Sequence, residues 1–151
     1  MKDESNSLCE IKVSYSIKVK KVDRKKINQS RDCYNILKDI YNSETVEMRE
    51  DFYIICVNRS NEMIGYHKIS SGGVSGTVVD ARIIFSIAIN SMASGIFLSH
   101  NHPSGQLQPS EQDISLTEKI KQGAKLLDMQ LLDHIIYTPE GYYSFADEGV
   151  L

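Results

Sequence analysis

Apolar residues along the chain fall into short runs that are separated by polar turns. The run at 52–57 is continuous, rich in β-formers and short, which indicates a strand buried on both faces. Between residues 11 and 20 apolar positions partly alternate with polar ones, and this period is typical of a half-buried strand. The whole pattern predicts strands over residues 11–20, 52–57, 63–69, 95–98, 129–137 and 142–145.

Longer segments carry apolar residues at helical spacing. Ser30 can cap the first of them, whose apolar face consists of Cys33, Ile36, Leu37, Ile40 and Tyr41. The second spans 79–92, and the third follows Ser110 with an inner face of Ile114, Thr117, Ile120, Ala124 and Leu127. This order predicts an α/β fold, a mixed β-sheet flanked by helices. We expect residues 11–151 to form a single domain after a disordered tail at 1–10.

The charge and the N-terminus narrow the class of protein. A net charge of -3 and an isoelectric point near 5.8 give no general signal for nucleic-acid binding. A basic run at 18–26 is either a solvated strand end or an electrostatic docking patch. The first ten residues lack the apolar stretch of a signal peptide, and no apolar run approaches the roughly 20 residues of a membrane helix. We therefore expect a cytoplasmic protein.

The cysteines Cys9, Cys33 and Cys56 are widely spaced and odd in number. Their spacing matches neither a zinc knuckle nor a disulfide framework. Cys33 and Cys56 lie within apolar patterns, so we expect both to be small residues of the core.

Candidate chemistry lies where the 95–98 strand ends. His100 and His102 are two positions apart in an extended segment, so their side chains point the same way, with Cα atoms roughly 6.5–7 Å apart. Two imidazoles at that separation can converge on one zinc ion. Pro103 and Gly105 then turn the chain, and Asp113 in the first turn of the next helix can supply a third ligand. Three protein ligands leave a fourth position for water, as in a catalytic zinc site.

The same residues also have interpretations that need no metal. Two neighbouring histidines on a loop are commonly surface or hydrogen-bonding groups. Ser110 and Asp113 fit a capping box, in which Ser110 caps the helix and Asp113 reaches back to its start. The residues by themselves leave the metal site and the capping box both open.

A wider pattern resembles a known family. His100-Asn101-His102, then seven residues, Ser110, two residues and Asp113 resemble the JAMM metalloprotease signature of JAB/MPN domains. The extended pattern more narrowly resembles the RadC family, through Pro103, Gly105, Thr117, Leu132–Ile136, Tyr143–Phe145 and Glu148-Gly149. The similarity runs from about Glu50 to the C-terminus. It implies a layered α/β/α fold of the JAB/MPN type.

The resemblance implies roles for matching residues. His100, His102 and Asp113 would bind one zinc ion, and Ser110 would stabilise the oxyanion of a tetrahedral intermediate. Glu50 matches the upstream glutamate that holds the water and moves its proton. Two neighbouring carboxylates are alternatives for that role, namely Glu47 and Glu44.

Two further residues near the C-terminus allow two interpretations. Asp133 and His134 either orient a ligand or the substrate from behind, or form a strand pair satisfied by the backbone. Cys56, close to Glu50 along the chain, is interpreted as core because it lies in an apolar strand.

The implied activity is zinc-dependent hydrolysis of a peptide, isopeptide or related amide bond in a protein or peptide substrate. The alternative is a non-enzymatic module, associated with DNA repair or serving as a protein scaffold, that retains the zinc pocket. Longer RadC-like proteins carry a helix-hairpin-helix region, for which too few residues precede Glu50, so DNA binding has no clear motif here. A zinc deaminase would need H-x-E and P-C-x-x-C, and neither occurs.

Overall fold

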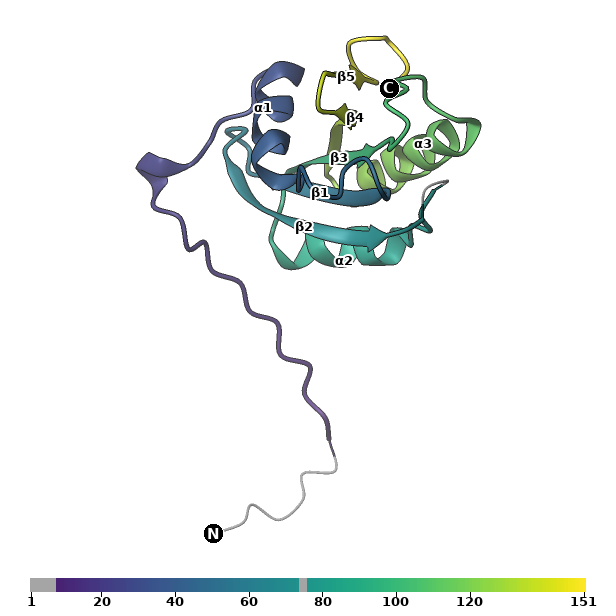
Figure 1. Cartoon of the computed structure of the whole chain (residues 1–151). Helices are drawn as coiled ribbons and strands as arrows, with labels where there is room; N and C mark the ends of the chain where they lie inside the picture. The colour runs from purple at the N-terminus through teal and green to yellow at the C-terminus, as the bar shows by residue number, and fades with distance from the viewer. Residues whose placement is uncertain (1–7, 74–75) are drawn as a thin grey trace.

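The apolar runs of the sequence become the strands of one sheet, with helices on both of its faces (Figure 1). The computed structural model describes residues 8–73 and 76–151. The elements in chain order are η1 (Lys21–Asp23), α1 (Ser30–Ile40), β1 (Asp51–Val57), β2 (Met63–Ser71), α2 (Ala81–Asn90), β3 (Gly95–Asn101), α3 (Glu111–Leu126), β4 (Gln130–Thr138) and β5 (Gly141–Ser144).

The sheet is mixed and has five strands in the order β2-β1-β3-β4-β5. β1 pairs antiparallel with both β2 and β3, β3 pairs parallel with β4, and β4 pairs antiparallel with β5. Every residue of β1 and β3 is buried, as the continuous apolar runs indicate. The predicted α/β fold with a mixed sheet is therefore confirmed. β3 continues beyond the predicted 95–98 to Asn101, so His100 lies within the sheet.

Alternation along β1 divides the core into two clusters. Tyr53, Ile55 and Val57 join the cluster that α1 covers, whereas Ile54 and Cys56 face the cluster beneath α2 and α3. A fully buried aliphatic side chain contributes about 1.5–3 kcal/mol to stability, so both faces of the sheet hold the helices firmly. Cys33 and Cys56 are buried free thiols, and their assignment to the core is confirmed.

The helix starts follow from local capping chemistry. Asp80 accepts a hydrogen bond from the Arg82 N–H and so begins α2 inside the predicted 79–92 segment. In α1 the prediction of Ser30 as the cap is wrong, because Gln29 is the cap and Ser30 is the first helical residue. The Asp32 carboxylate accepts from the backbone N–H groups of both Asn28 and Gln29, which closes the first turn one position earlier.

The predicted strand over 11–20 is wrong. Residues 11–18 have no regular secondary structure, and Ile11 and Val13 are 87% and 67% exposed. A strand needs a partner for its backbone hydrogen bonds, and alternation by itself does not provide one. In Figure 1 this segment runs away from the sheet. Of the predicted tail at 1–10, residues 1–7 lie outside the described residues, as do 74–75 of the connection after β2.

The apolar face of α3 is narrower than predicted. Thr117, Ile120 and Ala124 are buried, but Ile114 and Leu127 are each 43% exposed. The helix therefore contacts the sheet through its middle, and its first turn is left open toward solvent beside the end of β3. Asp113 belongs to that first turn and is only partly buried.

Candidate metal centre

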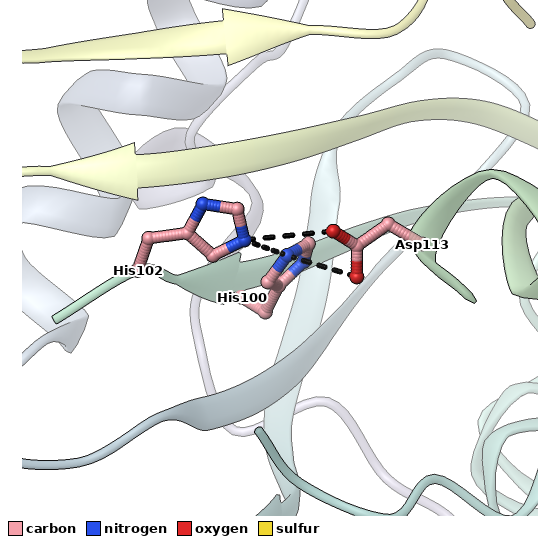
Figure 2. A group of neighbouring side chains, drawn as sticks. All are labelled: His100, His102 and Asp113. Atoms are coloured by element: carbon pink, nitrogen blue, oxygen red, sulfur yellow. Dashed lines mark hydrogen bonds and ion pairs between the residues drawn. The ribbon is translucent and has the colours of Figure 1, made fainter. Parts of the chain in front are cut away.

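The end of β3 and the start of α3 bring three potential ligands together (Figure 2). His100 is fully buried in β3, His102 follows the strand, and Asp113 approaches from the first turn of α3. The Nε2 atoms of the two histidines are 2.9 Å apart. The Asp113 carboxylate oxygens lie 3.3 Å from the Nε2 of His100 and 3.5 Å from the Nε2 of His102.

These separations fit a metal ion with tetrahedral coordination. Ligand atoms about 2.0–2.1 Å from one tetrahedral zinc lie roughly 3.3 Å from each other. The three separations of 2.9, 3.3 and 3.5 Å are close to that edge length. Two imidazole nitrogens and one carboxylate oxygen are also a donor set that divalent metals use in proteins. The group can therefore hold a metal ion without rearrangement of its backbone.

Asp113 serves the helix and faces the histidines at the same time. One carboxylate oxygen accepts a hydrogen bond of 2.8 Å from the Ser110 N–H, and the Asp113 N–H donates to Ser110 Oγ at 3.1 Å. The capping box is thus present. Its geometry points the carboxylate toward His100 and His102, so the two interpretations of Ser110 and Asp113 are compatible. The cap orients the candidate ligand.

The tautomer of His100 is set by a chain of buried hydrogen bonds. Thr117 Oγ1 uses its only proton to donate to the Asp113 carbonyl oxygen at 2.6 Å. Toward His134 the hydroxyl of Thr117 can therefore only accept, so the His134 Nδ1–H donates to Thr117 Oγ1, also at 2.6 Å. Burial holds the pKa of His134 well below its usual value, so its ring is neutral and its Nε2 is an acceptor. His100 Nδ1–H donates to that nitrogen at 2.8 Å. The lone pair of His100 Nε2 therefore points at the candidate site.

A backbone carbonyl group orients the His102 ring so that its Nε2 also faces the candidate site. Its Nδ1–H donates to the Gln106 carbonyl oxygen at 2.7 Å, which leaves Nε2 with the lone pair when the ring is neutral. Two lone pairs facing each other across 2.9 Å repel unless a cation lies between or beside them. The two nitrogens and the negative charge of Asp113 therefore favour binding of a cation at the site, either a proton or a metal ion.

Electrostatics in the metal-free protein follow this arrangement. Hydrogen bonding to Asp113 raises the pKa of His102. Burial opposes ionisation of Asp113, but the neighbouring rings of His100 and His102 hold its pKa far below the usual range. Asp113 is thus an anion at any ordinary pH, and its charge favours the protonated form of His102.

Metal affinity is expected to fall on acidification. A metal must displace the His102 proton, and because the pKa of His102 is raised above 6.5, this competition begins above pH 6.5. Below the raised pKa, each pH unit should weaken binding about tenfold from this group alone. Titration of zinc against a competing chelator between about pH 5.5 and 8 measures the slope. An affinity that does not change over this range would contradict the assignment of His102 as a ligand.

Glu50 and Ser110 face the same cavity as the cluster. This cavity, of about 590 Å³, is lined by Glu50, His102, Ser110 and Asp113 among others. Burial raises the pKa of Glu50, and the charges of His100 and His102 act against that rise. Glu50 is thus the predicted carboxylate that shares a cavity with Asp113.

The alternatives to Glu50 are placed differently. Glu44 and Glu47 are exposed. Glu47 lines a neighbouring cavity of about 410 Å³ on another side of His102, together with Glu140. Neither glutamate lines the cavity that contains Asp113 and Ser110.

Asp133 and His134, which were predicted as a pair from the sequence, have different surroundings in the structure. The His134 side chain contacts His100, as described above. Asp133 instead accepts hydrogen bonds from the Ser144 hydroxyl and the Ala146 N–H, and so supports the turn after β5. Sequence reasoning gave no role to the Thr117 hydroxyl or to Asn101. The signal that could have identified Asn101 is its amide side chain at the end of a buried strand, where each polar group needs a partner.

Comparison with known proteins identifies the family to which this chain belongs. The family model described as a RadC-like JAB domain matches residues 27–150. The chain belongs to the RadC-like JAB domain family. The UPF0758 proteins of Flavobacterium johnsoniae and Porphyromonas gingivalis are each 42% identical to it, over 126 and 129 residues. These stretches cover 83% and 85% of this chain.

The relatives of this RadC-like JAB domain are longer proteins. The chain spans about half of their length, 54% of the Flavobacterium johnsoniae protein and 56% of the Porphyromonas gingivalis protein. A UPF0758 protein of Methanosarcina barkeri is 32% identical over 126 residues, 83% of this chain and 54% of its own length. Among the described residues, no helix combines the length and the apolar character that crossing a membrane requires.

Proposed function

We propose that this chain is a zinc-dependent hydrolase that cleaves a peptide, isopeptide or related amide bond. The observation that carries the proposal is the convergence of His100, His102 and Asp113 beside a cavity that Glu50 and Ser110 also line. A metal site, a carboxylate and a hydroxyl at one opening are the groups that metal-assisted amide hydrolysis needs. The JAMM-like spacing of these residues supports the same reaction class.

Each residue has a role that its contacts support. Bound zinc would supply a Lewis acid and lower the pKa of water to near 7. Glu50 accepts a proton from the attacking water and delivers it to the leaving amine, and burial raises its pKa toward the range that suits both steps. Ser110 Oγ accepts from the Asp113 N–H, which leaves its own O–H to donate to the substrate carbonyl oxygen.

Metal removal tests the proposal directly. Chelated protein is expected to lose hydrolysis of quenched peptide and isopeptide substrates, and about one equivalent of zinc should restore it. Circular dichroism of the chelated protein is the control for folding, because a packed core surrounds the sheet on both faces. Equal activity with and without zinc would contradict the proposal. Tight zinc binding with every amide substrate left intact would favour the non-enzymatic module instead.

A further inference from the structure

Asn101 lies between the two histidines and points to the other side of β3. Asn101 is fully buried, and the oxygen and both N–H groups of its side-chain amide form hydrogen bonds. The Oδ1 atom accepts from the Asp51 N–H at 2.8 Å. The Nδ2 group donates to the carbonyl oxygens of Val46 and Arg49, at 2.7 and 2.8 Å.

All three partners belong to the segment from Val46 to Asp51, which carries Glu50. The backbone of Glu50 is itself paired, since its N–H donates to the Gly73 carbonyl oxygen at 3.2 Å and its carbonyl oxygen accepts from the Gly72 N–H at 2.8 Å. Asn101 bonds on both sides of Glu50 in the sequence, at Arg49 and at Asp51. The segment is thereby attached to the strand that bears His100.

Asp51 attaches the same segment to β2. Its carboxylate lies 3.3 Å from both the Arg49 Nε and the Lys68 Nζ, and it accepts from the Ser71 hydroxyl. The position of Glu50 is therefore determined from two directions. Asn101 holds it relative to β3, and Asp51 holds it relative to β2.

We propose that Asn101 is a positioning residue, which sets the place of the Glu50 carboxylate relative to His100 and His102. Only a primary amide offers one acceptor and two donors at this position. An aspartate keeps the acceptor but turns a negative charge toward two carbonyl oxygens, and alanine removes all three bonds. Side chains alternate between the two faces of β3, which explains the arrangement. His100 points to the metal cluster, and the next residue, Asn101, points to the segment from Val46 to Asp51 on the other face.

The kinetic test rests on the proposed function, and the exchange test does not. In zinc-loaded protein, Asn101→Ala is expected to lower kcat about 100-fold with little change in KM, because a misplacement of about 1 Å costs that much. Zinc content should stay near one per chain, since the ligands lie on the other face of the strand. Asn101→Asp should show the same kinetic pattern. If the alanine variant does not fold, the aspartate variant replaces it in the kinetic test.

Two further measurements separate positioning from general loosening. Hydrogen exchange at the Asp51 amide, which donates to Asn101, should accelerate in Asn101→Ala. In a Glu50→Gln background, Asn101→Ala should slow hydrolysis no further, because the two residues act through one carboxylate. Asn58→Ala is the matched control. That residue also uses its amide to hold a turn, at Ser60 and Glu62, but in the distant β1–β2 connection.

The outcomes distinguish this proposal from the proposed function. A near-normal kcat in folded Asn101→Ala, or additive losses in the double variant, would overturn the positioning role while hydrolysis itself stands. If the wild-type protein cleaves no amide bond, the hydrolase proposal fails and the exchange rate alone decides whether Asn101 anchors the segment. Unchanged exchange at Asp51 overturns the anchor in either case.

Discussion

Replacing His100 with alanine is expected to reduce bound zinc from about one ion per chain to nearly none. His100 is fully buried and its Nε2 lies within 3.3 Å of both other ligand groups. Loss of this nitrogen leaves His102 and Asp113 as a pair open to solvent, which is too few ligands for a stable site. Elemental analysis after dialysis against buffer with a trace of zinc measures the change, and hydrolysis should disappear with the metal.

The chain offers a matched control for this substitution. His67 is exposed on β2, and His67→Ala should leave the zinc content unchanged. The Nε2 atom of His134 would lose its hydrogen-bond partner in His100→Ala, so the melting temperature should be measured for both variants. Zinc retained by folded His100→Ala, or wild-type protein free of metal under zinc-replete conditions, would contradict the assignment.

The inner strands and the helices could be predicted because their signal is local. Most of β1 and the first four residues of β3 form continuous apolar runs, which are typical of strands buried on both faces of a sheet. The segment at 11–20 has an equally local signal, but a strand also needs an unpaired edge beside it, and no alternation of side chains encodes that edge. The start of α1 differs for a local reason, because Ser30 and Gln29 competed for the cap and the carboxylate of Asp32 decided the first turn.

The candidate ligands could be predicted for a related reason. His100 and His102 share one strand end and Asp113 lies in the first turn of the next helix, so one turn of the chain brings them together. Their supporting residues come from further away. Asn101 bonds to Val46 across 55 positions, and His134 bonds to His100 across 34. Contacts between such distant positions depend on strand order, which a single sequence does not display.

Substituting glutamine for Glu50 is expected to leave zinc bound and to lower kcat by roughly 10²–10⁴-fold. Glutamine keeps the size of the side chain but cannot accept and return a proton. Burial already raises the pKa of Glu50, so the neutral side chain should cost the fold little. Zinc stoichiometry, kcat and the melting temperature of the same preparation together measure the effect.

Glu47→Gln is the matched control, because Glu47 is exposed and lines the neighbouring cavity beside His102 rather than the one that contains Asp113. It should keep both zinc and most of the activity. If Glu47→Gln is the inactive variant, the proton-transfer role belongs to Glu47. If Glu50→Gln loses zinc, Glu50 supports the metal site and its role as the general base is wrong. Retained zinc with lost turnover in Glu50→Gln alone is the result that the shared cavity of Glu50, Ser110 and Asp113 predicts.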